Sequence, residues 1–236
     1  MYCVRQPSKA FFALKMSPPG RSMPILGRKN ARILAHLLRL AEILAPKPPS
    51  AHLVFKKMKV IIIGNGIAGT TAARTLRKLC DCKITIISAE SRHFFSRTAL
   101  MYVYMGHMKW ENIKPYEDWF WVKNRIGLVH DRVESIDFEQ KKVHLTGSKS
   151  MDYDHLVLAL GSKPNKYGWP GQDLPGVQGL YHKQDLESME VATRQGIRRA
   201  VIVGGGLIGV EMAEMLISRR IPVTFLVREN EFWANI

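Results

Sequence analysis

The segment from Lys59 to Gly69 limits what this chain can fold into more than any other part of its sequence. Its first five residues, KVIII, are mostly β-branched and apolar, which is typical of a parallel strand buried on both faces. The strand runs into Gly-Asn-Gly-Ile-Ala-Gly, and a helical pattern then extends from Thr70 to Lys78. A strand, a G-x-G-x-x-G turn and a helix in this order predict an α/β unit that binds a dinucleotide.

Each glycine of this turn has its own expected role. Gly64 allows the tight turn, Gly66 lets the backbone come close to a pyrophosphate, and Gly69 lets the helix pack closely on the strand. Ile67 and Ala68 complete the turn, where the start of a helix offers free N–H groups and the positive end of its dipole to phosphates. We therefore expect these five residues to hold a dinucleotide pyrophosphate.

Glu90 supplies a further part of the expected site. A second apolar strand is predicted at residues 83–87, and Glu90 follows it about 21 positions after Gly69. An acid at this distance accepts hydrogen bonds from a ribose hydroxyl in dinucleotide-binding units. A glycine-rich turn in some other kind of α/β protein is the weaker alternative.

The same pattern occurs a second time, at Ala200–Glu214. The strand AVIV runs into Gly204-Gly205-Gly206-Leu207-Ile208-Gly209, a helical pattern follows, and residues 222–227 supply the next strand. Two such fingerprints in one chain are much more specific than one. They predict one site for a flavin dinucleotide and one for a nicotinamide dinucleotide, because hydride passes between two such cofactors.

The sequence between the fingerprints predicts shorter elements. We expect a loop entering a short helix at 91–102, a helical turn that starts at Pro115, and a buried strand at 155–161. A linker rich in Pro and Gly is expected from Lys163 to Gly179, and a helix from Asp185 to Gly196. Alternating apolar residues predict a β-meander at residues 128–133, 134–138, 142–145 and 151–153. The aromatic residues at 116–121 are expected to be core rather than a binding surface.

The net charge of +15 does not predict nucleic-acid binding by the folded part. Residues 1–57 hold eleven Lys or Arg and one acid, a net of +10, which leaves 24 basic and 19 acidic residues, a net of +5, in the remainder. The excess of basic residues is thus a property of the N-terminal segment.

That N-terminal segment is rich in proline and contains one amphipathic pattern, residues 30–44, too short and too charged to span a membrane. A transit peptide and a basic surface helix both fit it. We favour a third interpretation, in which the natural chain starts at Met58 and residues 1–57 are a disordered extension or upstream translation.

The cysteines and histidines predict no metal site. Cys3, Cys80 and Cys82 are too few for a disulfide framework, and we expect Cys80 and Cys82 only to pack between the first helix and the second strand. The histidines show no ligand spacing. The folded part is expected to be cytoplasmic.

From Met58 onward the chain resembles the FAD-dependent pyridine nucleotide-disulfide oxidoreductase superfamily, most of all ferredoxin and rubredoxin reductases, NADH oxidases and the flavin part of nitrite reductase. Both fingerprints carry the resemblance, and Ala159-Leu160-Gly161-Ser162-Lys163-Pro164 is similar to the A-T-G-x-x-P signature. The resemblance implies two Rossmann-like units of three-layer ββα type, the second incomplete. The implied domains are 1–57 (extension), 58–165 (FAD-binding) and 166–236 (linker and start of the NAD(P)-binding domain).

The resemblance also assigns roles to single residues. The first fingerprint would hold the FAD pyrophosphate, Glu90 the adenosine ribose, and the backbone of Val133 the adenine. Ala159 and Gly161 would approach the flavin through their backbone, although Leu160 replaces the usual threonine.

The second fingerprint, with Glu211, is similar to the nicotinamide site G-G-G-x-I-G-x-E. Arg97 lies in a segment similar to Y-S-[KR]-P-x-L, and the resemblance implies that Arg97 pairs with Glu211 beside the flavin as the catalytic ion pair. Arg228 and Glu229 close the strand after the second fingerprint; arginine favours NADP and an acid favours NAD. We lean to an NADP-tolerant site, and both cofactors stay open.

Residues 91–105 contain no cysteine, which excludes the redox pair that the disulfide reductases carry there. Electrons are then expected to leave the flavin directly for a protein, a quinone, a dye or oxygen. Family members continue well beyond the second fingerprint, so we expect a truncated member. An inactive fragment or a non-catalytic dinucleotide-binding protein is the alternative, and a dehydrogenase that uses only NAD(P) is a weaker one.

Overall fold

The computed structural model describes residues 57–194 and 196–228. The amphipathic pattern at 30–44, Cys3 and Glu229 lie outside these residues. Within them, no helix is long and apolar enough to cross a membrane.

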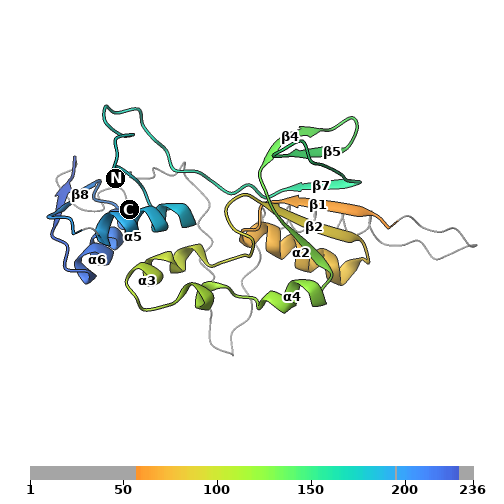
Figure 1. Cartoon of the computed structure of the whole chain (residues 1–236), viewed down its shortest axis with the longest axis horizontal. Helices are drawn as coiled ribbons and strands as arrows, with labels where there is room; N and C mark the ends of the chain where they lie inside the picture. The colour runs from red at the N-terminus through yellow and green to blue at the C-terminus, as the bar shows by residue number, and fades with distance from the viewer. Residues whose placement is uncertain (1–56, 195, 229–236) are drawn as a thin grey trace, which may run out of the picture.

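A four-stranded parallel sheet forms the centre of the first unit (Figure 1). Its strand order is β3-β2-β1-β7, with β1 at Lys59–Ile63, β2 at Lys83–Ser88, β3 at Ile126–His130 and β7 at His155–Leu158. β1 pairs with β2 along its whole length and with β7 on its other side. This central position explains why β1 is almost continuously apolar, because neither of its faces meets water.

Two further layers cover the faces of this sheet, as Figure 1 shows. On one face, α2 (Ile67–Leu79) and α4 (Asp118–Lys123) enclose a core that includes Ile62, Ala73 and Ile86. On the other face lies the antiparallel sheet β4-β5-β6, and the core there contains Ile61, Ile63, Ile87, Val143, Leu145 and Tyr153. The predicted three-layer α/β architecture is therefore confirmed.

The predicted β-meander is partly wrong. Its last three strands form β4 (Val133–Asp137), β5 (Lys142–Leu145) and β6 (Ser150–Asp152). Its first segment instead lies in β3, which extends the parallel sheet beside β2. The reason is that β3 buries apolar residues on both faces, with Leu128 in the helix-side core and Val129 in the core under the antiparallel sheet.

The predicted helical turn at Pro115 is also displaced. α4 begins at Asp118, with Glu117 as N-cap, and so places a carboxylate in its first turn where the helix dipole favours it. The expectation that the aromatic residues form core is confirmed for most of them: Tyr116 stacks on Phe120 at 4.5 Å and Trp121 is buried. Trp119 instead faces solvent, with 60% of its surface exposed.

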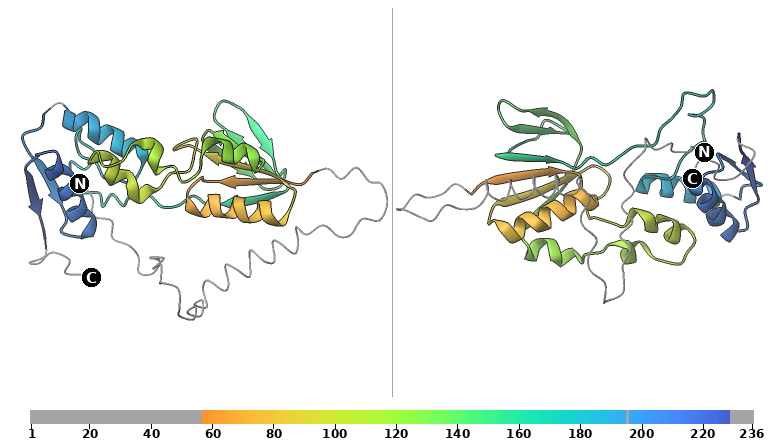
Figure 2. Two further views of the ribbon diagram at one scale, coloured as in Figure 1. Left: turned by 90° about the horizontal axis from the view of Figure 1, so that it is seen from below. Right: turned by 180° about the vertical axis from the view of Figure 1, so that it is seen from behind.

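The second unit contains a two-stranded parallel sheet, β8 (Ala200–Val203) and β9 (Val223–Leu226), with the helices α5 (Lys183–Arg194) and α6 (Leu207–Ser218). Its core also includes the segment of the first unit that forms η1 (Arg97–Ala99), α3 (Leu100–Tyr104) and η2 (Trp110–Ile113). Figures 1 and 2 show α3 close to α5 and α6, at the other end of the molecule from the strands of the first sheet.

Cys80 and Cys82 form a disulfide, which corrects the expectation that they only pack. One intervening residue brings their Cα atoms to 5.4 Å, so the two thiols meet in the turn between α2 and β2. This turn lies at the amino end of β2, whereas the glycine-rich turn lies at the carboxyl end of β1. The disulfide is thus at the far end of the sheet from the expected cofactor site.

Candidate dinucleotide-binding site

The first glycine-rich turn has the geometry that its fingerprint predicts. Gly64 has φ +109°, and a Cβ there would lie 2.1 Å from the carbonyl oxygen of Ala159. A Cβ on Gly69 would lie 1.9 Å from the carbonyl oxygen of Gly64. Both positions therefore require glycine, one for the turn and its neighbouring strand and the other for the packing of α2 on the turn.

Gly66 differs from these two glycines. It is the N-cap of α2 with φ −68°, which any residue can adopt, and a Cβ there would meet no protein atom within 4 Å. No side chain caps α2, and no acid lies in its first turn. The start of the helix therefore presents open space and uncapped N–H groups at Ile67 and Ala68, which fits a bound phosphate.

The second glycine-rich turn repeats this arrangement. Gly204 has φ +111°, and a Cβ on Gly209 would lie 2.5 Å from the carbonyl oxygen of Gly204. Gly206 is the N-cap of α6 and no side chain caps the helix. Leu207 and Ile208 are 47% and 40% exposed, so the start of α6 is also accessible to a ligand.

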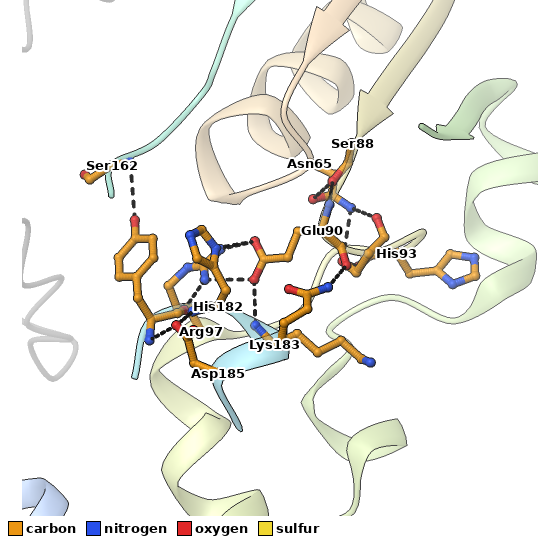
Figure 3. Close-up of polar contacts among 12 residues, drawn as sticks. Asn65, Ser88, Glu90, His93, Arg97, Ser162, His182, Lys183 and Asp185 are labelled. Carbon is orange, nitrogen blue, oxygen red and sulfur yellow. Dashed lines mark hydrogen bonds and ion pairs between the residues drawn. The ribbon is translucent and has the colours of Figure 1, made fainter. Parts of the chain in front are cut away.

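Glu90 lies just beyond β2, inside a network of donors (Figure 3). The guanidinium of Arg97 binds both of its carboxylate oxygens, at 2.6 and 3.0 Å. The backbone N–H of Lys183, at the start of α5, donates to the same carboxylate at 2.9 Å, and the imidazole of His182 lies 3.6 Å from it. Glu90 thus connects the first unit to the start of α5.

The charge of Glu90 is stabilised in this position. Burial raises the pKa of its carboxyl group, but the hydrogen bonds from Arg97 and Lys183 and the nearby positive charge of Arg97 outweigh burial. The pKa of Glu90 is therefore below its ordinary value. A carboxylate in this state accepts hydrogen bonds, as the ribose role requires.

The expected ion pair between Arg97 and Glu211 is not formed. Among the residues that the structure describes, Arg97 pairs with Glu90, and its guanidinium lies 4.5 Å from the ring of Tyr181. Glu90 lies in the loop that leads to η1, whose first residue is Arg97, and its carboxylate accepts two parallel hydrogen bonds from the guanidinium. α6, which carries Glu211, meets this segment through the apolar side chains of its core, Met212 among them.

The other predicted residues of the first site lie at the same edge of the sheet. Ala159 follows β7 and donates its N–H to the carbonyl of Ile63. Gly161 has φ +71°, and Val133 begins β4 shortly after β3 ends. The structure thus places residues from all four parallel strands at their carboxyl ends, where ligands bind in open α/β sheets. The cofactor roles of these residues stay predictions.

Glu211 and Arg228 lie in the second unit. Glu211 is half-buried in α6, and Arg228 is exposed two residues after the end of β9. α6 begins just beyond the carboxyl end of β8, and Arg228 follows the carboxyl end of β9. Their roles toward a nicotinamide cofactor also stay predictions.

Sequence reasoning missed several residues at the junction between the units. Asn65, inside the first turn, binds the loop after β2. Asp185 accepts hydrogen bonds from the backbone N–H groups of Tyr181 and His182 and so organises the start of α5. An acid near the start of a predicted helix is a signal for such a cap, whereas the contacts of Asn65 leave no mark in the sequence pattern. In residues 57–194 and 196–228 no cluster of His, Cys, Asp or Glu could hold a metal ion.

Comparison with known proteins matches most of this chain to one protein family. Residues 58–235 match the family model of the pyridine nucleotide-disulphide oxidoreductases. The chain is 34% identical over 181 residues to a probable ferredoxin reductase, CtmF, of Castellaniella defragrans, covering 75% of this chain and 44% of that protein. It is 32% identical over 174 residues to the nitrite reductase [NAD(P)H] of Bacillus subtilis, covering 72% of this chain and 21% of that protein.

A solved structure, the NAD-dependent persulfide reductase of A. fulgidus, matches with a TM-score of 0.67 and 29% identity. The match covers 74% of this chain and 35% of that one. The chain therefore spans less than half the length of these three proteins.

Proposed function

Because the chain belongs to the pyridine nucleotide-disulphide oxidoreductase family, we propose that it takes part in the transfer of hydride from NAD(P)H to FAD. Members of this family are NAD(P)H-dependent flavoenzymes, and FAD supplies the redox chemistry when it is bound. The observation that carries the proposal is that both turns have the same geometry, with a glycine at positive φ and an uncapped helix start.

We assign FAD to the first turn and the nicotinamide cofactor to the second. The uncapped N–H groups of Ile67 and Ala68 would bind the FAD pyrophosphate, and Gly66 leaves the space that it needs. Glu90 would accept a hydrogen bond from the adenosine ribose. Gly204, Gly206 and Gly209, with Leu207 and Ile208, would hold the nicotinamide dinucleotide in the same manner.

Glu90 has to share its carboxylate to do this. Arg97 and Lys183 already donate to it, and a carboxylate has about four lone-pair positions in all. A ribose hydroxyl can therefore join these donors or replace one of them. Arg97, which Glu90 holds at the same edge of the sheet, would place positive charge close to the cofactor phosphates.

Electrons would pass from the flavin to a protein, a quinone or oxygen without a redox disulfide. Residues 91–105 contain no cysteine, and the Cys80–Cys82 disulfide lies at the far end of the sheet. The similarity to a ferredoxin reductase supports a protein acceptor. A cytoplasmic location stays a prediction of the sequence.

A non-catalytic dinucleotide-binding protein or an inactive fragment is the second candidate. The pairing of Arg97 with Glu90 favours it, because the cation expected beside the flavin is held elsewhere and Glu211 is left without it. Binding without turnover would distinguish this candidate from the enzyme.

The test is the Gly66→Ala variant of the full chain. Its Cβ meets no protein atom, so we expect unchanged thermal stability but FAD affinity lowered about tenfold or more, since the methyl group occupies the space of the pyrophosphate. Flavin fluorescence titration measures the affinity, and absorbance at the flavin band measures reduction by NADH and NADPH.

The corresponding variant of the second turn, Gly206→Ala, is the matched control. It is expected to leave FAD affinity unchanged and to weaken only the nicotinamide cofactor. If the unmodified chain binds no FAD, or if Gly66→Ala binds it equally well, the assignment of the first site is wrong. FAD that binds but is reduced by neither cofactor supports the non-catalytic candidate.

A further inference from the structure

Asn65 is a buried polar residue inside the first glycine-rich turn, and the proposed cofactor contacts do not use its side chain. It is the residue between Gly64 and Gly66, and only 7% of its surface is exposed. A G-x-G-x-x-G turn places no chemical demand on this position. A buried amide there therefore needs a physical reason, because it is costly to bury without hydrogen-bond partners.

The amide of Asn65 binds both ends of the short loop that carries Glu90. Its Nδ2 donates to the backbone carbonyl of Ser91 at 2.7 Å, and its Oδ1 accepts a hydrogen bond from the hydroxyl of Ser88 at 2.9 Å. Figure 3 shows the side chain of Asn65 next to Ser88. The hydroxyl of Thr70 in turn donates to the carbonyl of Asn65 at 3.1 Å, so the residue is also fixed to α2.

The loop is short, and its other side-chain hydrogen bonds lie within it or come from Arg97 and the start of α5. Ser88 is the last residue of β2, and Ser91 donates its hydroxyl to the carbonyl of His93. Glu90 lies between them and contacts α5 through its carboxylate and through its carbonyl, which accepts from the side chain of Gln184. Glu90 also accepts from Arg97 and donates its N–H to the hydroxyl of Ser88, but among the described contacts of Ser88 and Ser91 only those of Asn65 join the loop to the glycine-rich turn.

We infer that Asn65 is a positioning residue that sets Glu90 at a fixed distance from the phosphate-binding turn. This inference rests on the proposed FAD site. The pyrophosphate and the adenosine ribose are covalently joined in the ligand, so the turn and the carboxylate must keep a matching separation. One side chain with a donor and an acceptor, placed in the turn and bound to both ends of the loop, provides that separation.

Only an amide meets both demands at this position. A carboxylate of the same size keeps the acceptor for Ser88 but loses the donor, and it faces the carbonyl oxygen of Ser91. An apolar side chain leaves the Ser91 carbonyl and the Ser88 hydroxyl without this partner in a buried place. Asn65→Ala and Asn65→Asp therefore remove the tether in two different ways.

The experiment combines two readouts on the full chain. Amide hydrogen exchange of the peptide 88–93 without cofactor reports on the loop, and we expect exchange about tenfold faster in Asn65→Ala while β1 and β2 keep their protection. Flavin fluorescence titration reports on the site, and we expect FAD affinity about tenfold lower. In a Glu90→Ala background, the same Asn65→Ala change is expected to alter FAD affinity less than about twofold, because its effect acts through Glu90.

Asn124→Ala is the matched control. Its side-chain amide also donates to a backbone carbonyl, that of Phe120 at 2.8 Å, but this bond lies at the end of α4, away from the loop 88–93 in the sequence. It is expected to leave both the exchange of 88–93 and FAD affinity unchanged. Asn65→Asp, which keeps the size of the side chain, serves where Asn65→Ala does not fold.

The outcomes separate this inference from the proposed function. Unchanged exchange of 88–93, or an equal loss of FAD affinity with and without Glu90, overturns the positioning role even when FAD binds normally. An unmodified chain that does not bind FAD overturns the proposed function and the ribose role with it, and the exchange measurement still decides whether Asn65 holds the loop.

Discussion

The carboxylate of Glu90 joins the two units through charged hydrogen bonds. Its carboxylate accepts from Arg97, which belongs to the first unit in sequence, and from the start of α5 in the second unit. Only 17% of its side-chain surface is exposed, so solvent screens these contacts weakly. The Arg97 side chain is 34% exposed, so the pair is part-buried, and removing one partner leaves the other charge only partly compensated by solvent.

The stability that Glu90 supplies is predicted to depend on pH. The pKa of Glu90 is below its ordinary value near 4.5, so in this range the unfolded chain binds more protons than the folded chain, and stability falls as pH falls. We expect the unmodified chain to exceed Glu90→Gln by about 1–3 kcal/mol in free energy of unfolding at pH 7. This difference should shrink as pH falls from 4.5 through the lowered pKa.

Urea unfolding of both proteins between pH 7 and pH 3 measures this difference. Subtracting the variant removes the contributions of Asp81 and Asp118, whose pKa values are also lowered, Asp81 chiefly by a hydrogen bond from Lys57 and Asp118 chiefly by one from Lys114. Glu187→Gln is the control, since Glu187 forms an exposed pair with Lys183, and such pairs contribute little. A difference that stays constant with pH would show that the charge of Glu90 is not what stabilises the junction.

At the scale of elements, the sequence predicts the helices and strands that have a regular residue pattern. It does not predict elements whose place depends on contacts with distant parts of the chain. β1, α2, β8 and α6 were predictable because strand, glycine-rich turn and helix follow one another in the sequence, and the requirement for glycine at Gly69 is set by Gly64 five positions earlier. β3 was not predictable as a strand of the parallel sheet, because its apolar residues resemble those of a meander strand. Its two faces are covered only after it pairs with β2. The Arg97–Glu90 pair was missed for a related reason: periodicity says nothing of how a loop folds back on itself.

The second unit has one covered and one open sheet face. Ile202 in β8 is 1% exposed and packs in the core with α6, whereas its neighbour Val203 is 38% exposed. β9 places Leu226, which is 55% exposed, opposite Val203. The alternation therefore assigns Ile202 to the core and Val203 to the open face.

Two alanine substitutions test this assignment. Ile202→Ala is expected to lower the free energy of unfolding by about 2–4 kcal/mol, because it opens a cavity in the core. Val203→Ala is expected to cost less than about 1 kcal/mol, because the methyl groups that it removes are already partly in water. Chemical denaturation of both variants gives the comparison, and equal costs would mean that the open face is covered in solution.

At the scale of the whole molecule, the segment 97–113 connects the two units. In sequence it belongs before the predicted boundary at residue 165, yet η1, α3 and η2 pack in one core with α5 and α6. This packing was not predictable, because α3 is short and its partners lie about eighty or more positions further along the chain. The predicted domain boundaries stay predictions, and the core adds a contact that crosses them.

Tyr104 is at the centre of this contact. It is fully buried, and the guanidinium of Arg219, just after α6, lies 3.7 Å from the centre of its ring and donates from Nε to its carbonyl at 2.8 Å. No described residue hydrogen-bonds its buried hydroxyl. The ring and the backbone of Tyr104 therefore join the units, and the hydroxyl does not contribute.

Substitutions at Tyr104 should therefore separate the contribution of its ring to stability from that of its hydroxyl. Tyr104→Phe keeps the ring over Arg219 and removes a polar atom that is buried without a partner, so we expect stability unchanged or slightly raised. Tyr104→Ala should lower the free energy of unfolding by about 3–5 kcal/mol, as large aromatic truncations in cores do. Because the loss lies between the units, amide exchange should rise in α3 and α5 before it rises in β1 and β2. Equal exchange in all four elements would mean that the chain unfolds as one body and that α3 does not join separable units.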